Sequence, residues 1–121
     1  MTILEDIDRA AQAIKDGRMR SILPVARNFT IIWHGCRCTE GAPRYLVYSY
    51  ATEVARAIKH SDGSFGVYVY TNTFKHSTTT SRHVRRFLTT MVGNIDWRAL
   101  YRECEQTMSW YINVNEFKKE N

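Results

Sequence analysis

The sequence contains few of the residues from which a fold or an activity is usually recognised. Its 121 residues include three cysteines, two prolines and six glycines. An odd number of cysteines argues against a closed set of disulfides, so we expect a reduced, cytoplasmic protein. The glycines are scattered and form no loop that could cradle a phosphate, so the sequence contains none of the usual nucleotide-binding loops.

Long apolar runs are also missing. No run approaches the roughly 18–20 residues that a membrane-spanning helix needs. The first residues, Met1–Asp8, are acidic and amphipathic. A secretory signal instead begins with basic residues followed by an apolar run. We therefore expect neither secretion nor a membrane partner.

Acidic side chains are absent from one long stretch of the chain. No Asp or Glu lies between Asp62 and Asp96, and the whole chain has a formal net charge of +5. A local excess of positive charge attracts polyanions such as nucleic acid, or an acidic face of another protein. The side chains of this stretch that we predict to bind a partner are Lys75, His76, Arg82, Arg85 and Arg86.

The composition is otherwise that of a globular protein. Hydrophobic residues make up 44% of the chain and charged residues 24%. That content is too apolar for wholesale disorder, and the length is enough for one hydrophobic core. We therefore predict a single domain over residues 1–121.

The periodicity of the apolar residues predicts an α+β fold. Thr2 and Glu5 form a capping box for a helix over Ile3–Asp16. β-branched and aromatic runs then predict a sheet of three to four strands. The strands are antiparallel because their connections are too short for parallel crossovers. They are Phe29–Trp33, Tyr45–Tyr50, Glu53–Ile58 and Phe65–Tyr70, with a kink near Ala51 and a hairpin turn at Asp62 and Gly63.

Two helices are predicted after the sheet, and we expect them to pack on one of its faces. Ser81 is a good N-cap for the first helix. Its apolar face would be Val84, Phe87, Leu88 and Met91, opposite the arginines. Asp96 would cap the second helix. The apolar face predicted for that helix consists of Trp97, Leu100, Tyr101, Cys104, Met108 and Tyr111.

His34, Cys36 and Cys38 are the candidate ligands for a metal. They alternate along the chain, so on an extended strand they would point to one side. A structural zinc site needs four such ligands, and the others would have to come from distant residues. The alternative is a strand end at which the cysteines pack as small apolar side chains. A catalytic cysteine beside His34 matches no nucleophile motif, so we predict no metal, no cofactor and no catalytic residue.

Four tyrosines stand at alternate positions of the predicted strands. Tyr48 and Tyr50 would share one face of their strand, and Tyr68 and Tyr70 one face of theirs. On an exposed sheet face, aromatic rings among cations make a stacking platform for single-stranded nucleic acid. On a half-buried sheet, tyrosines line the edge of the core with their hydroxyls in water. The second interpretation is favoured because the helices must cover one sheet face.

The arginines of the predicted helix also allow two interpretations. A polar face opposite an apolar one is ordinary for a surface helix. Here the face carries Arg82, Arg85 and Arg86 with no carboxylate four residues away. Arginine is the cation that pairs best with phosphate or carboxylate. The Ser/Thr run at 77–81 adds hydroxyl and amide donors at the helix N-terminus, where anions bind readily.

Part of the chain resembles a known group of proteins. Residues 48–55 read Tyr-Ser-Tyr-Ala-Thr-Glu-Val-Ala, and residues 79–83 read Thr-Thr-Ser-Arg-His. Both segments are similar to a pattern that recurs in short phage-encoded proteins of unknown function. The similarity covers roughly residues 45–87. It implies a phage or mobile-element origin and a location in the host cell, and it brings no activity with it.

Phage proteins of this size commonly act by stoichiometric binding. Our first hypothesis is therefore a non-enzymatic inhibitor, similar to anti-CRISPR proteins, that binds a host defence nuclease or ribonucleoprotein through the basic stretch. The second is a nucleic-acid-binding accessory or regulatory protein that uses the same residues on phosphates. The third is a small cysteine- or metal-dependent enzyme. The sequence leaves the oligomeric state and the partner's identity open.

Overall fold

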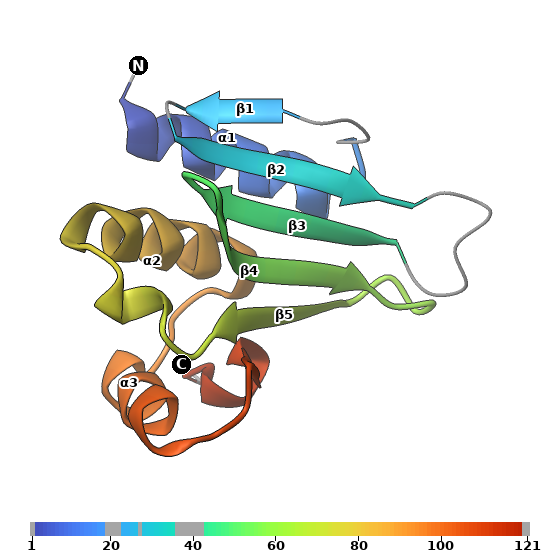
Figure 1. Ribbon diagram of the computed structural model, residues 1–121. Helices are drawn as coiled ribbons and strands as arrows, with labels where there is room; N and C mark the ends of the chain where they lie inside the picture. Colours follow the sequence, from blue (N-terminus) through green and yellow to red (C-terminus); the bar gives the residue numbers. More distant parts are fainter. Residues whose placement is uncertain (1, 19–22, 27, 36–42, 120–121) are drawn as a thin grey trace.

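A computed structural model describes residues 2–18, 23–26, 28–35 and 43–119 and has the predicted α+β architecture (Figure 1). Helix α1 (Ile3–Lys15) comes first. The strands are β1 (Leu23–Ala26), β2 (Phe29–His34), β3 (Arg44–Ser49), β4 (Thr52–Lys59), β5 (Phe65–Tyr70) and β6 (Tyr111–Asn113). Between β5 and β6 lie a 3-10 turn η1 (Thr73–Lys75), α2 (Thr78–Val92) and α3 (Trp97–Gln106), and a second 3-10 turn η2 (Val114–Phe117) follows β6.

The strands form one antiparallel sheet in the order β1-β2-β3-β4-β5-β6. The four predicted strands are all present, and the sheet has one further strand at each edge. β1 was not predicted because it is short and contains Pro24. Its pairing with β2 also has an irregular register between Pro24 and Ala26. β6 was not predicted because it is only three residues long; they pair with Tyr68–Tyr70 of β5.

The turn between β3 and β4 replaces the kink that the sequence suggested. Ser49 pairs with Thr52, so Tyr50 and Ala51 form a tight hairpin connection. Tyr50 adopts a φ of 57°, a conformation that residues other than glycine rarely take. Its backbone N–H donates to the carbonyl of Asn28 over 2.7 Å, which ties the turn to the start of β2.

Helices α1 and α2 lie on the same side of the sheet, behind it in the view of Figure 1. Alternate residues of the strands pack against them, among them Phe29, Ile31, Val47, Val67 and Val69. The helices contribute Ile7 and Ile14 of α1 and the predicted apolar face of α2, Val84, Phe87, Leu88 and Met91, all of which are buried. The two predicted faces of α2 are therefore confirmed.

The opposite side of the sheet is not covered by these helices. Residues that are directly paired across antiparallel strands project from the same face. The pairing of Ile32 with Leu46, Leu46 with Arg56 and Arg56 with Tyr68 defines that face. We call it the open sheet face; its residues are Thr30, Ile32, His34, Arg44, Leu46, Tyr48, Glu53, Arg56, Ile58, Gly66, Tyr68, Tyr70, Tyr111 and Asn113.

The start of α2 differs from the prediction. The helix is capped by Ser77 rather than Ser81, because the Ser77 hydroxyl accepts the backbone N–H of Thr80 over 3.0 Å. The Ser/Thr run therefore forms the first helical turn instead of a loop before it. A sequence in which every position of the run can act as an N-cap does not specify which one does.

The end of α3 also differs. Asp96 caps the helix as predicted, accepting the backbone N–H of Ala99 over 3.2 Å. The chain becomes extended at Thr107, so the predicted apolar face does not continue beyond Cys104. Met108 is 98% exposed, and Tyr111 belongs to β6. Among the described helices, none combines the length and the apolarity that crossing a bilayer requires.

Candidate partner-binding surface

The predicted partner-binding side chains lie around a series of adjoining depressions. Arg82, Arg85 and Arg86 line a depression of about 640 Å³ that also touches α1. Arg85 and Lys75 line a second of about 330 Å³. Lys75 and His76 line a third of about 280 Å³. Because neighbouring depressions share a lining residue, the structure brings all of the predicted residues together, and we call them the α2 surface.

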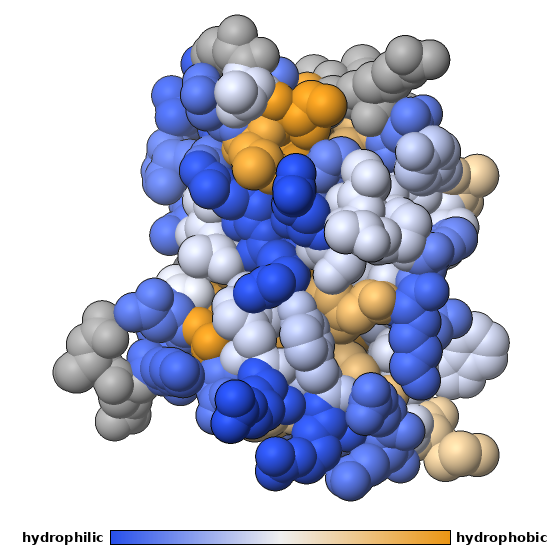
Figure 2. Space-filling model, turned by 90° about the vertical axis from the view of Figure 1, so that its left-hand side faces the viewer, coloured by the Kyte–Doolittle hydropathy of each residue, from blue (hydrophilic) through white to orange (hydrophobic). Residues whose placement is uncertain are grey.

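Figure 2 views the molecule from the end at which α1 and α2 begin. Hydrophilic side chains extend across the middle of this face, below an apolar patch near the top of the view. The depression of about 640 Å³ has both apolar and polar lining, since Leu4 lines it together with the arginines, Thr78 and Ser81. A protein interface typically pairs an apolar centre with such a polar rim.

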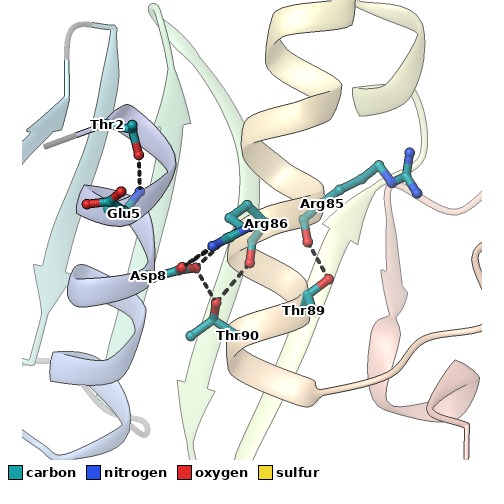
Figure 3. Close-up of polar contacts among 7 residues, drawn as sticks. All are labelled: Thr2, Glu5, Asp8, Arg85, Arg86, Thr89 and Thr90. Atoms are coloured by element: carbon teal, nitrogen blue, oxygen red, sulfur yellow. Dashed lines mark hydrogen bonds and ion pairs between the residues drawn. The ribbon is translucent and has the colours of Figure 1, made fainter.

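Arg86 has a carboxylate partner that the local sequence did not reveal (Figure 3). Its Nε lies 2.8 Å from Oδ1 and 2.9 Å from Oδ2 of Asp8 on α1. Thr90 donates its hydroxyl to the same carboxylate over 2.7 Å. The hydrogen bonds from Arg86 hold the pKa of Asp8 below its usual value. The expectation of an arginine face without compensating acid is therefore wrong for Arg86, because the acid comes from another helix.

Arg85 is oriented by aromatic rings instead. Its guanidinium lies 5.0 Å from the ring centre of Trp97 and 5.9 Å from that of Tyr101, both on α3. Figure 3 shows the side chain pointing away from α1. Such cation–π contacts stabilise the position of the cation without cancelling its charge. Arg85 thus remains exposed on a defined site between α2 and α3.

Arg82 and Lys75 carry the least compensated charge of the α2 surface. Both side chains are exposed, and neither forms an ion pair with a carboxylate in the part of the chain that the structure describes. His76 is exposed as well, with Nε2 3.3 Å from the hydroxyl of Thr52. His83, by contrast, faces the core, edge-on to Phe29 at 5.9 Å. Burial lowers the pKa of His83, so this residue adds no charge to the surface.

The predicted tyrosines divide into two groups. Tyr48, Tyr68 and Tyr70 lie half-buried on the open sheet face, whereas Tyr50 lies in the β3–β4 turn and is 59% exposed. The prediction that Tyr48 and Tyr50 share a strand face is therefore wrong, because the strand ends at Ser49. The helices cover the other side of the sheet, so Tyr48, Tyr68 and Tyr70 do not line the core between the sheet and the helices.

A polar cluster on the open sheet face was missed by the sequence analysis. Glu53 accepts hydrogen bonds from the hydroxyls of Tyr70, over 2.9 Å, and Tyr111, over 2.6 Å. Arg56 completes the cluster through an ion pair of 2.9 Å to Glu53. Burial, followed by the hydrogen bond to Glu53, raises the pKa of Tyr111. Only the strand register and the unpredicted β6 bring these side chains together.

Of the candidate residues for a metal or a nucleophile, only His34 belongs to the part of the chain that the structure describes. His34 is exposed at the end of β2, and Cys36 and Cys38 lie outside the described residues. No group of three or more His, Cys, Asp or Glu side chains that could hold a metal occurs within residues 2–18, 23–26, 28–35 and 43–119. Burial raises the pKa of the Cys104 thiol to about 11, so little of it is the reactive thiolate near neutral pH.

Two large apolar side chains next to the open sheet face were also missed. Trp110 is 80% exposed and Met108 is 98% exposed, on the connection between α3 and β6. They line a groove of about 430 Å³ together with Glu53, Tyr70 and Asn72. Helical periodicity predicts Met108 on a buried helix face, and its exposure follows from the end of α3 at Gln106.

Fold and surface together define a small α+β protein with a basic helical face on one side of an antiparallel sheet. Comparison with known proteins adds no activity to that description. The chain belongs to a family of unknown function, DUF8033, whose model matches residues 11–103. No curated protein and no solved structure matches the chain.

Proposed function

We propose that this protein is a non-enzymatic binding protein that docks its α2 surface onto an acidic face of a macromolecular partner. The observation that supports the proposal most strongly is the grouping of Lys75, Arg82 and Arg85 around connected depressions. These cations come from η1 and α2, so their positions are set by regular structure rather than by a loose tail.

The pairing within the surface favours a protein or ribonucleoprotein over a bare phosphate backbone. Arg86 is already matched by Asp8, and Arg85 by aromatic rings, which fixes their geometry before a partner arrives. Arginine and aromatic side chains are enriched at the centres of protein interfaces. Pre-ordered side chains also lose less conformational entropy on binding.

The partner that we propose is a host defence nuclease or ribonucleoprotein, inhibited by stoichiometric binding in the manner of anti-CRISPR proteins. The resemblance of residues 45–87 to short phage-encoded proteins supports this choice. A direct nucleic-acid binder that uses the same α2 surface is the competing hypothesis, and a catalytic role for His34, Cys36 and Cys38 is the third.

The test is capture of the partner by the tagged protein from a host lysate, divided into nuclease-treated and untreated halves. We expect one specific protein in both halves. Recovery of nucleic acid alone, lost in the treated half, would contradict the proposal. Direct phosphate binding to duplex DNA should also weaken with salt with a log–log slope of about −0.9 per phosphate neutralised.

Charge-reversal variants then test whether the α2 surface does the binding. Arg82→Glu should abolish capture without lowering the melting temperature, since Arg82 forms no described ion pair. Arg102→Glu is the matched control, because it changes the net charge equally on the exposed side of α3, where Arg102, like Arg82, forms no described ion pair and lines none of these depressions. Arg86→Glu is unsuitable, since it would place a second carboxylate beside Asp8.

A further inference from the structure

The open sheet face carries aromatic rings and cations but is absent from the function proposed above. Tyr48, Tyr68, Tyr70 and Tyr111 project from it, on β3, β5 and β6. Arg56 lies between Leu46 and Tyr68 in the same row across the sheet. Neither α1 nor α2 covers this side of the sheet (Figure 1). Aromatic side chains on an uncovered sheet face are the usual means by which a sheet binds unpaired bases.

Tyr68 has a position suited to stacking. Gly66, its neighbour on the same face of β5, has no side chain, and the Tyr68 ring occupies the space beside it. A Cβ atom at Gly66 would lie 2.9 Å from Nε2 of His60, 3.1 Å from Cε2 of Tyr68 and 3.3 Å from the Tyr68 hydroxyl. The ring therefore leans along the sheet instead of standing away from it, and Tyr68 is only half-buried. Part of the ring stays available to a planar ligand.

Trp110 extends this aromatic area at the rim of the face. Trp110 lines the groove of about 430 Å³ together with Glu53 and Tyr70 of the open sheet face. Two hydrogen bonds hold the connection in place: Thr71 donates its N–H to the carbonyl of Trp110 over 3.2 Å, and Ser109 donates to the hydroxyl of Thr107 over 3.1 Å. The backbone that carries this exposed ring is therefore attached to the end of β5, which limits the conformational freedom lost when a flat partner binds.

The charge of the face is compatible with a phosphate backbone. Glu53 is its one carboxylate among the described residues, and Arg56, Tyr70 and Tyr111 all direct hydrogen-bond donors at it. Arg44 adds a positive charge at the other end of the strands. The Trp110 groove adjoins the depression lined by Lys75 and His76, because Thr52 and Asn72 line both. Cations therefore lie on both sides of the aromatic rings.

We infer that the open sheet face binds single-stranded nucleic acid, with bases stacked on Trp110 and Tyr68 and phosphates near Arg44 and, at the border with the α2 surface, near Lys75. Stacking of this kind is tolerant of sequence, because every base has a π face. The inference goes beyond the proposed function and does not depend on which protein the α2 surface binds. It assigns to the protein a second ligand, on a different side of the sheet from α2.

The test uses a fluorescein-labelled oligothymidylate of about 12 nucleotides, a length within the range that compact single-strand binding folds cover. Fluorescence anisotropy of the full chain is compared with the same backbone made abasic. We expect clear binding of the oligothymidylate and much weaker binding of the abasic strand. Equal affinity for the two strands would show that the backbone charge alone is recognised, and it would overturn the inference, as would no binding to either.

Two variants locate the site. Trp110→Ala should weaken binding of the oligothymidylate by about 5- to 150-fold, which corresponds to about 1–3 kcal/mol for one stacked base. Trp110 is 80% exposed, so its removal should leave folding intact. Gly66→Ala should weaken binding too, since its Cβ crowds the rings of both His60 and Tyr68 and makes them shift while every aromatic residue is kept.

Tyr50→Ala is the matched control, because Tyr50 is an exposed tyrosine outside the open sheet face. It should leave the affinity unchanged. The assignment of the site is wrong if Trp110→Ala binds the oligothymidylate as tightly as the wild type does. It is also wrong if Tyr50→Ala loses as much affinity for the oligothymidylate as Trp110→Ala. Arg82→Glu distinguishes this inference from the proposed function, because it should lose the protein partner and keep the oligothymidylate.

Discussion

The α2 surface and the open sheet face have their charge and their aromatic residues arranged in opposite ways. On the α2 surface, cations are outermost, and aromatic rings such as Trp97 and Tyr101 support Arg85 from below. On the open sheet face, the charged pair of Glu53 and Arg56 lies with little exposure among half-buried tyrosines, with Arg56 5.0 Å from the ring centre of Tyr111, and Trp110 is the exposed ring at the rim. The first arrangement suits an acidic, irregular surface, whereas the second suits flat groups.

The two regions also differ in how they depend on the rest of the fold. The α2 surface is built from one helix and the turn before it, so a local change should have local consequences. The open sheet face gathers side chains from β2 to β6, so its geometry depends on every strand register. Substitutions that disturb the core, the sheet face or the helical surface should therefore differ in size in that order.

The largest effect should come from the core beneath the α2 surface. Phe87 is completely buried, 6.4 Å from the ring of Phe29. Phe87→Ala should lower the free energy of unfolding by about 3–5 kcal/mol, because it removes a large side chain and leaves a cavity. Urea denaturation measures the change. Thr89→Ala, on the exposed side of the same helix, should stay within about 0.5 kcal/mol of the wild type; similar losses for both would show that α2 has no distinct faces.

An intermediate effect is expected on the open sheet face. Glu53→Ala leaves Arg56, Tyr70 and Tyr111 without their common acceptor and should destabilise the protein by about 1.5–3 kcal/mol. Thermal unfolding provides the measurement. Glu103→Ala on the exposed side of α3 is the control and should have almost no effect. A neutral Glu53→Ala would mean that the cluster does not attach β6 to the sheet.

The smallest effect should be at the ion pair on the α2 surface. Asp8→Asn weakens the contact with Arg86, and because both side chains are partly solvated the loss should be about 0.2–1 kcal/mol. The folded protein lowers the pKa of Asp8, so this contribution is complete above the unfolded value and is lost as the pH falls through the folded one.

Unfolding of wild type and Asp8→Asn across a pH series measures that dependence. The difference in stability should be constant above about pH 5 and should shrink below about pH 4. High salt should reduce it as well, since exposed ion pairs are screened. A difference that persists at low pH would show that the substituted amide disturbs the helix contact by its shape rather than by its lack of charge.

The sequence predicts best what depends on neighbouring residues. The cap at Thr2, the cap at Asp96 and strand β5 all follow from local patterns and are confirmed. The arginine face of α2 was predicted for the same reason, because helical spacing alone places Arg82, Arg85 and Arg86 on one side.

What the sequence does not predict depends on contacts between distant segments. Asp8 reaches Arg86 across 78 positions of the chain, and Tyr111 reaches Glu53 across 58. β6 has no strand pattern of its own and forms because β5 offers a free edge to it. The exposure of Trp110 follows from where α3 ends, and the several alternative hydroxyl caps made even the start of α2 ambiguous from sequence.

The most direct test of the account compares Arg82→Glu with Trp110→Ala in both binding measurements, capture of the protein partner and anisotropy of the oligothymidylate. The account predicts that Arg82→Glu loses the partner and keeps the oligothymidylate. Trp110→Ala should do the reverse. If either variant lost both ligands while remaining folded, the α2 surface and the open sheet face would be one binding site, and the distinction between them would be wrong.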